Sequence, residues 1–374
     1  MMTRLATYLL VVIVGSMFIA GCSPEIERPS LEDMAFIGVV GFDYINEKDV
    51  KVSVSTPVPS THSKEKTQVY STVATVMSEA MLKMSTKAER TMSLSQLRVI
   101  LFSEEYARKV GIRKVILDLY RNPIVGENAF VAIVKGSAEE LIRASYQNKP
   151  ELNTYLNDLL RPRVETAFSS FTSIQDSVFM MTNEVSDPNL PYLVKEKDDI
   201  QIAKVALFKD DKMIGSISQR EGKLIQALLG RNRLPRMSFE FQEQTSKGTK
   251  TEQVVFDFVW SKSKIRSNGS KERPVISMQL GMRGVLIGYT GNKDLKSNHA
   301  MGLLKKQLES EIKKETLKLL QRLQKTGVDP ASLEESLRQK YYGEWTRPIA
   351  MELYQKAGFN ITINLEIVGY GTIK

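Results

Sequence analysis

The chain holds a single cysteine, Cys22, among 374 residues. One cysteine excludes any disulfide within the chain, so the fold must rest on packing and hydrogen bonds. With 42% hydrophobic and 25% charged residues, the composition is that of an ordinary folded protein. A chain of this length can bury a large core without covalent cross-links.

An apolar segment lies directly ahead of that cysteine. Arg4 is the only charged residue before Glu25, and Leu5 to Ala20 are almost wholly apolar. A positive start, a short apolar run and small residues behind it are typical of a secretory signal peptide. The run is shorter than the roughly 20 residues that a permanent membrane span needs; an uncleaved N-terminal anchor is the alternative.

The residues Ile19-Ala20-Gly21-Cys22 resemble the lipobox of bacterial lipoproteins. The resemblance implies cleavage ahead of Cys22, which then carries S-diacylglycerol and an N-acyl chain. A cysteine is required because sulfur is the nucleophile that accepts the lipid, and several acyl chains hold a protein on a bilayer far more firmly than one. We predict a signal peptide over residues 1–21, lipidation of Cys22 and a polar tether over residues 22–30.

The formal net charge is +9. Lysine and arginine are spread along the chain, without the compact basic block that favours nucleic-acid binding. We therefore predict no nucleic-acid partner. Attraction to an anionic lipid surface would suit a chain anchored on a bilayer, but a solvated basic surface is the simplest explanation of the charge.

Periodicity predicts both strands and helices. The apolar run Met34–Ile45 and the alternating segment Asp49–Ser55 predict a pair of strands. Tyr70–Lys87 has helical spacing, and its methionine stripe suits the core or, as the alternative, a peptide-binding groove. Asn298–Leu323 predicts a long amphipathic helix, and Phe359–Ile367 alternates strictly as a strand.

Strands and helices intermingle without a regular βαβ rhythm. This predicts an α+β fold of three domains, each a mixed or antiparallel β-sheet packed against α-helices on one side. The proline-rich, charged segment Asp187–Asp199 indicates a linker. The predicted domains cover residues 31–190 (N-terminal), 200–268 (middle) and 275–374 (C-terminal, with the long helix and the terminal strand).

The sequence contains no recognisable catalytic or metal site. His62 and His299 lie far apart, whereas a histidine-based zinc site needs clustered ligands. The G-x-S-x-G elbow and the P-loop pattern are absent. The paired acids Glu104-Glu105 and Asp210-Asp211 suit a helix start and a turn. We predict no enzyme, no cofactor and no metal, and a binding or scaffolding role.

Several segments together resemble the Ger(x)C family, the C-subunit lipoproteins of bacterial spore germinant receptors. Behind the lipobox they follow the family order: LEDMAFIGVVGFDY (Leu31–Tyr44), SQLRVILFSEEYA (Ser95–Ala107), VAIVKGSAEELI (Val131–Ile142), DPNLP (Asp187–Pro191), ALFKDDKMIGSIS (Ala206–Ser218), SKSKI (Ser261–Ile265) and YYGEWTRPIAMELY (Tyr341–Tyr354). The resemblance implies three α+β domains and a non-enzymatic subunit required for nutrient-triggered germination signalling.

The same resemblance implies partners and a location. The partners would be the integral-membrane A and B subunits of the receptor, to which nutrient recognition is mainly attributed. Cys22 would hold the chain on the outer face of the cell membrane or on the spore inner membrane. Family members often carry Trp-Asp directly after the lipidated cysteine, whereas Ser23-Pro24 follow it here, so the tether departs from the family.

Two other functions are alternatives. A lipoprotein solute-binding protein of a transporter would show two doubly wound lobes of repeated strand–helix units. The hairpin-rich middle of the chain and the alternating terminal strand argue against that architecture. An exported enzyme is the third reading, and it lacks a candidate site.

Overall fold

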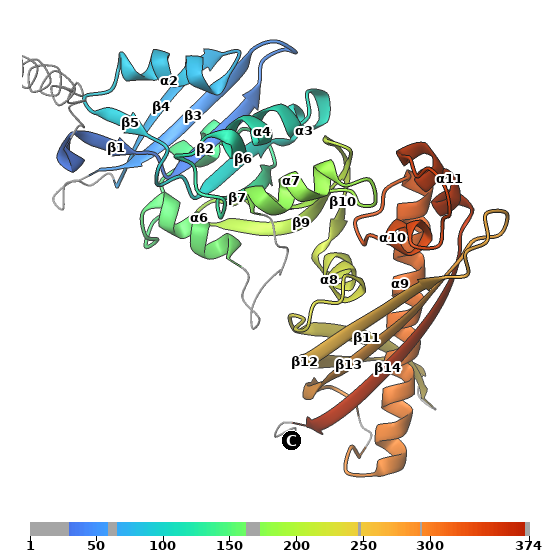
Figure 1. Ribbon diagram of the computed structural model, residues 1–374. Helices are drawn as coiled ribbons and strands as arrows, with labels where there is room; N and C mark the ends of the chain where they lie inside the picture. Colours follow the sequence, from blue (N-terminus) through green and yellow to red (C-terminus); the bar gives the residue numbers. More distant parts are fainter. Residues whose placement is uncertain (1–29, 59–65, 162–172, 246–247, 292–293, 371–374) are drawn as a thin grey trace, which may run out of the picture. The chain divides into compact units, whose positions relative to one another are not determined.

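The computed structural model describes residues 30–58, 66–161, 173–245, 248–291 and 294–370 (Figure 1). The predicted signal peptide, Cys22 and His62 lie outside these ranges, as does the predicted tether except for Ser30. The chain divides into two units between Met34 and Ala35. The described part of the first unit is Ser30 to Met34, with the 3-10 turn η1 (Leu31–Asp33).

An eight-stranded mixed sheet organises residues 39–218. Its strand order is β10-β9-β8-β7-β6-β2-β3-β4; β2, β6, β7 and β8 are parallel, and the other pairs are antiparallel. The strands are β2 (Val39–Tyr44), β3 (Val50–Pro57), β4 (Thr67–Ala74), β6 (Val99–Ser103), β7 (Phe130–Val134), β8 (Asn189–Lys195), β9 (Ile200–Lys209) and β10 (Lys212–Ser218). The short strands β1 (Met34–Phe36) and β5 (Thr91–Ser93) form a separate two-stranded sheet.

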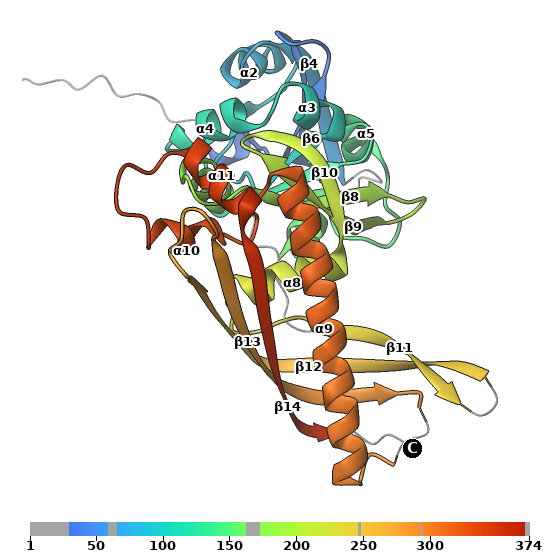
Figure 2. The same cartoon turned by 90° about the vertical axis from the view of Figure 1, so that its right-hand side faces the viewer.

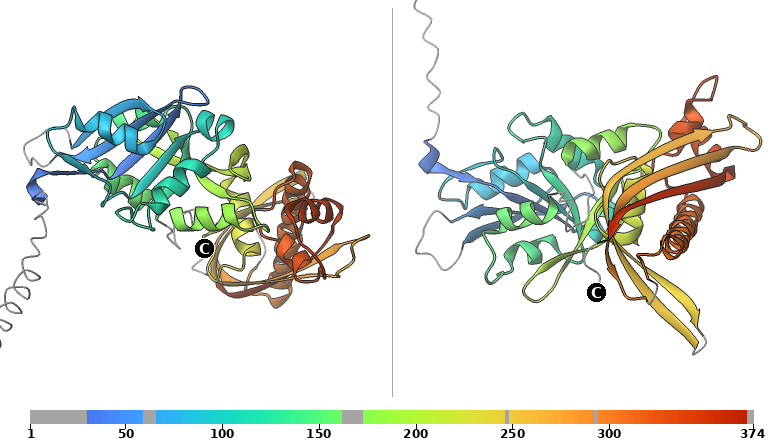
Figure 3. Two further views of the ribbon diagram at one scale, coloured as in Figure 1. Left: turned by 45° about the horizontal axis from the view of Figure 1, so that its top comes forward. Right: turned by 90° about the horizontal axis from the view of Figure 1, so that it is seen from below.

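Helices cover both faces of the eight-stranded sheet (Figure 3). Alternate residues of a strand point to opposite faces, and Phe42 and Val39 accordingly belong to different hydrophobic clusters. The Phe42 face carries α2 (Met77–Ser85), α3 (Glu104–Lys109), α4 (Arg113–Arg121) and α7 (Ile174–Thr182), and the Val39 face carries α5 (Ala138–Arg143) and α6 (Leu152–Leu160). The expectation of helices on one side is wrong for this sheet, because parallel strands such as β6, buried throughout, need cover on both faces.

Strand β2 and helix α5 lie unusually close. A Cβ atom on Gly41 would stand 2.8 Å from Ile142 Cδ1 and 3.0 Å from the Ala138 Cβ, so a larger residue there would force both neighbours to shift. The buried Asp43 carboxylate accepts hydrogen bonds from the Ala138 and Glu139 amides at 2.7 and 2.8 Å. Burial raises the pKa of Asp43 despite these bonds. Asp43 thereby fixes α5 on one face while its neighbour Phe42 points to the other.

A second sheet, in the last third of the chain, has four strands in the order β11-β12-β13-β14. It is antiparallel except for the β13–β14 pair, which is parallel. Its strands are β11 (Met237–Thr245), β12 (Gly248–Ser267), β13 (Val275–Tyr289) and β14 (Gly358–Tyr370), and the helices of this part are α8 (Gln219–Leu228), α9 (Asn298–Thr326), α10 (Glu334–Arg338) and α11 (Arg347–Lys356).

The long helix α9 lies along the edge strand β14 (Figure 2). Leu308 and Ile312 of the helix share a hydrophobic cluster with Ile361 and Ile363 of the strand. Glu309 of α9 also accepts a hydrogen bond from the Leu365 amide at 2.8 Å. The sequence predicted both the amphipathic helix and the alternating strand, and both predictions are confirmed.

Two local predictions are wrong. Residues 70–74, predicted to begin a helix, belong to β4 and pair with β3, and the helix begins only at Met77. The predicted linker Asp187–Asp199 contains β8, which is largely buried and pairs with both β7 and β9. In both segments pairing with a neighbouring strand outweighs the local sequence signal.

The strands of the predicted middle domain divide between the two sheets. β9 and β10 pair within the eight-stranded sheet, whereas β11 and β12 pair within the four-stranded sheet. The α+β class is confirmed, and the division into three domains stays a prediction.

Candidate functional site

Among the described residues, those singled out from the sequence do not form a site. His299 lies at the exposed start of α9, and Glu104-Glu105 begin α3, where they pair with Arg108 and Lys109 one turn on. Asp210 stands at the β9–β10 turn with a φ of 57°. Among the described residues, no cluster of three or more His, Cys, Asp or Glu side chains is arranged to hold a metal ion. No described helix is both long and apolar enough to cross a membrane.

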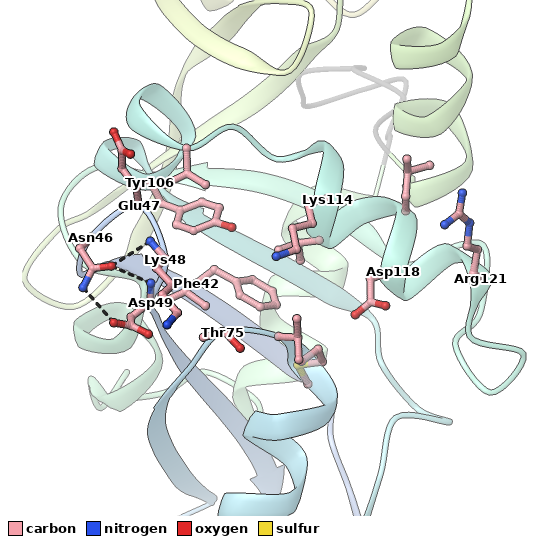
Figure 4. A pocket seen from close by; sticks show the side chains of 16 residues that line it. Phe42, Asn46, Glu47, Lys48, Asp49, Thr75, Tyr106, Lys114, Asp118 and Arg121 are labelled. Atoms are coloured by element: carbon pink, nitrogen blue, oxygen red, sulfur yellow. Dashed lines mark hydrogen bonds between the residues drawn. The ribbon is translucent and has the colours of Figure 1, made fainter.

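A pocket opens between the β2–β3 turn and helices α2 and α4, on the Phe42 face of the large sheet (Figure 4). We call it the α2–α4 pocket. Its volume is about 330 Å³, at the lower end of the roughly 300–1,000 Å³ usual for ligand pockets. Its lining residues are Phe42, Asn46, Glu47, Lys48, Asp49, Val50, Thr75, Val76, Met77, Tyr106, Val110, Lys114, Val115, Leu117, Asp118 and Arg121.

Aromatic rings form the base of the pocket. Phe42 of β2 stacks on Phe102 of β6 with ring centroids 5.2 Å apart, and Tyr106 of α3 stacks on Phe102 at 5.8 Å. The order of the strands places these rings together, because β2 and β6 are parallel neighbours and Phe42 is in register with Phe102. Such pairs hold their geometry by packing and quadrupole interactions, so the base is rigid.

Two capped backbone segments form one rim. In the β2–β3 turn, Asn46 Oδ1 accepts hydrogen bonds from the amides of Lys48 and Asp49, both at 2.8 Å, which is an Asx-type turn. At the start of α2, Glu79 accepts hydrogen bonds from the Thr75 amide and hydroxyl at 2.8 and 2.9 Å. The ion pair with Lys83 and these hydrogen bonds lower the pKa of Glu79 to about 2.

Helix α4 forms the other rim with three exposed charged residues. Lys114, Asp118 and Arg121 are spaced four and then three residues apart, which sets them along one side of a helix. Within the part of the chain that the structure describes, none of the three side chains makes a hydrogen bond or an ion pair. Helix α3 differs, because its acids pair with bases at four-residue spacing.

The hydroxyl of Tyr106 is a polar group at the aromatic base of the pocket. Tyr106 is only 4% exposed, and Figure 4 shows its hydroxyl directed into the pocket, on the side of Lys114. No described residue forms a hydrogen bond with it. Burial, helped by the charge of Asp211, raises the pKa of Tyr106 to about 12. The hydroxyl therefore stays protonated and can donate a hydrogen bond.

A second hollow of about 260 Å³ adjoins the pocket and shares Met77, Asp118 and Arg121 with it. Its further lining includes Met81, Leu94 and Leu119, so it extends the apolar part of the pocket along α2. The core interpretation of the methionine stripe is confirmed in part, and the peptide-binding groove stays a prediction. Met77 and Met84 are buried in the core, while Met77 and Met81 also line these hollows.

A second concentration of charge, which we call the Asp329 cluster, is buried. It consists of Asp187, Asp329, Glu334, Arg347 and Tyr354. Two hydrogen bonds join Asp187 and Asp329. The Asp187 amide donates to the Asp329 backbone carbonyl at 3.0 Å, and the Asp329 amide donates to the Asp187 side chain at Oδ2 at 2.7 Å. Arg347 pairs with the Asp187 carboxylate and lies 3.6 Å from Glu334 Oε2. The cluster joins Asp187, in the segment ahead of β8, to helices α10 and α11.

Burial governs the protonation of the Asp329 cluster. Asp329 and Glu334 are 0% exposed; burial raises the pKa of Asp329 far above its ordinary value and that of Glu334 to about 7. Arg347 acts in the opposite direction on Glu334. Neither carboxylate oxygen of Glu334 accepts a hydrogen bond from a described residue. Arg347 lies beside Asp187 and Glu334, and Asp329 is hydrogen-bonded to Asp187 and to the Glu334 amide, so the cluster is a structural junction.

Sequence reasoning missed both places. The pocket residues come from β2, α2, α3 and α4, and no motif links them. The one available signal was the side of α4 that carries Lys114, Asp118 and Arg121, and exposed helices commonly show such charges. The cluster unites Asp187 with residues more than a hundred positions later, which no local pattern could reveal.

Two family models match the chain. One is the spore germination protein N-terminal domain, over residues 27–195, and the other is the spore germination B3/GerAC-like C-terminal domain, over residues 203–371. These matches define the chain as a spore germination protein. It belongs to the Ger(x)C family, the family of germinant receptor subunits that its sequence resembles.

Individual relatives agree with this assignment. The chain is 22% identical over 359 residues to the spore germination protein GerQC of Bacillus cereus, covering 96% of this chain and 97% of the relative. It is 22% identical over 331 residues to the putative spore germination protein YfkR of Bacillus subtilis strain 168, covering 83% and 82%. The crystal structure of GerBC shares the fold, with a TM-score of 0.54 and 16% identity over 88% of this chain and 96% of that one.

Proposed function

We propose that this chain is the lipid-anchored, non-enzymatic subunit of a spore nutrient germinant receptor. It acts in nutrient-triggered germination through contacts with integral-membrane partner subunits. The observation that carries the proposal is the match of both family models, which together extend from residue 27 to residue 371. The lipobox-like Ile19–Cys22 directly ahead of that match supports the anchor.

The proposal places the chain on the outer face of the cell membrane and, in the spore, on the inner membrane. Acyl chains on Cys22 would provide the attachment, since each buried CH₂ contributes about 0.8 kcal/mol. Cleavage ahead of Cys22 would remove Arg4 and change the formal net charge from +9 to +8, which would favour an anionic bilayer surface at about 1 kcal/mol for each basic residue close to it. The folded residues would then be free to contact the membrane subunits.

The test replaces the native gene by Cys22→Ala and, as the matched control, by Ser23→Ala. We expect Cys22→Ala to lose membrane attachment in fractionated spores and to slow germination on nutrients, while Ser23→Ala behaves as wild type. Unchanged membrane retention of Cys22→Ala would overturn the lipid anchor. Normal nutrient germination in spores that lack the whole chain, with its paralogues also removed, would overturn the receptor role.

A further inference from the structure

We propose that the α2–α4 pocket binds a small zwitterion with an apolar body, which is the chemistry of a free amino acid with an apolar side chain. The resemblance attributes nutrient recognition mainly to the membrane subunits, so a site on this chain would be additional. The proposal stands on the pocket itself. Its failure would leave the receptor role intact, and failure of the receptor role would leave the pocket intact.

The size of the pocket limits the ligand to a small molecule. The pocket holds about 330 Å³, and the adjoining hollow, whose lining residues are half apolar and half polar, adds about 260 Å³. This space suits a compact head with one apolar side chain. The aromatic base and the thioethers of Met77 and Met81 provide the surface for that side chain, since ligand pockets bury most of a ligand against such groups.

The charges of the pocket favour a ligand that carries both signs over one that carries a single charge. The lining holds three acids, Glu47, Asp49 and Asp118, and three bases, Lys48, Lys114 and Arg121. A purely anionic or purely cationic ligand would meet as many repelling as attracting groups. A zwitterion can instead place its ammonium group toward acids and its carboxylate toward bases, and hydrogen bonds between charged groups are the strong ones.

Two residues of α4 are the natural partners for the head. Figure 4 shows the Lys114 ammonium and the Asp118 carboxylate both directed into the pocket, one turn apart on the helix. They do not pair with each other or with another described residue. Lys114 can therefore receive the ligand carboxylate and Asp118 the ligand ammonium group without breaking an existing bond.

The Tyr106 hydroxyl adds a hydrogen-bond donor at the aromatic base of the pocket. Tyr106 as a whole is 4% exposed, its hydroxyl makes no hydrogen bond with a described residue, and Figure 4 shows it directed into the pocket on the side of Lys114. As a protonated donor it matches a ligand carboxylate that is held by Lys114. The geometry thus orients the ligand, with its carboxylate toward Tyr106 and Lys114, its ammonium group toward Asp118 and its side chain toward Met77.

The experiment is titration calorimetry on the full chain purified in detergent, with three probes of one shape. Leucine carries both charges, isopentylamine lacks the carboxylate and 4-methylpentanoate lacks the ammonium group. We expect leucine to bind with a Kd on the order of 1 mM or tighter, and each single-charge probe to bind at least about tenfold more weakly. Equal binding of the three probes would overturn the proposal. So would the absence of leucine binding at a concentration about 20-fold above that expected Kd.

Variants assign the contacts. Asp118→Asn and Lys114→Gln should each weaken leucine binding about tenfold or more, and Tyr106→Phe severalfold, because it removes only the hydroxyl. Glu127→Gln and Lys135→Gln remove exposed charges of the same domain outside the pocket and should leave binding unchanged. If Asp118→Asn and Lys114→Gln bind leucine as tightly as these controls do, the pocket does not recognise the charged groups of the zwitterion.

Discussion

The α2–α4 pocket and the Asp329 cluster use charged side chains in opposite ways. In the pocket, Lys114 and Asp118 are exposed and have no partner among the described residues. In the cluster, Asp329 and Glu334 are fully buried, and Glu334 lies beside Arg347. Buried charges must be paired or neutralised because their desolvation is costly, whereas exposed charges cost the fold almost nothing. The first region is therefore available for binding, and the second holds the fold together.

The largest effect should come from removing the cation of the cluster. Arg347→Met leaves the Asp187 carboxylate, which is 1% exposed, without its counter-charge. Breaking such a buried pair costs about 3–5 kcal/mol, measurable as a lower urea midpoint at neutral pH. The matched control is Arg338→Met, which removes an exposed pair with Glu335 in the same segment and should cost less than about 1 kcal/mol. Equal losses in the two variants would show that the cluster contributes no more than a surface pair.

An intermediate effect should appear as a pH dependence. The pKa of Glu334 is about 7 in the folded chain against an ordinary value of 4.5. Between pH 4.5 and pH 7 the folded chain therefore holds a proton on Glu334 that the unfolded chain releases. The stabilisation from Glu334 is complete below about pH 4.5 and is lost as the pH rises through 7. Unfolding should become easier over this window, by something of the order of 1–3 kcal/mol.

Glu334→Gln tests that assignment, because glutamine keeps the shape and carries no titrating proton. The groups facing Glu334 are Asp187, Asp329 and Arg347, and they remain in the variant. Urea midpoints measured from pH 4.5 to pH 8 should fall less steeply for Glu334→Gln than for wild type. Parallel curves for the two proteins would assign the pH dependence to another group.

The smallest effect on stability should come from the pocket. Asp118→Asn and Lys114→Gln change exposed side chains that support no contact of the described fold, and such substitutions usually stay within about 0.5 kcal/mol. Thermal unfolding of the ligand-free variants should therefore match wild type. A loss above about 1 kcal/mol in either variant would show that these charges serve the fold and would remove the contrast between the two regions.

Local patterns predicted the strands and helices whose buried residues recur at one regular spacing along the chain. The strict alternation of Phe359–Ile367 gave β14, and the spacing of apolar residues over Asn298–Leu323 gave α9. Patterns failed where a strand partner from elsewhere decided the outcome. The start of one predicted helix belongs instead to β4, because it pairs with β3. The proline-rich segment forms β8, because it pairs with β7 and β9 on either side.

The sequence by itself determined the class of the protein. Its ordered segments predict a Ger(x)C member with an α+β fold, and the lone Cys22 behind an apolar run predicts a lipid anchor. Only the tertiary structure decided where charge is buried and where it is open. Asp118 is followed by Leu119 and Asp329 by Pro330, and neither neighbour tells whether the carboxylate is buried. Packing between distant segments buries one and leaves the other facing a pocket, and burial sets whether a carboxylate must be neutralised or can bind.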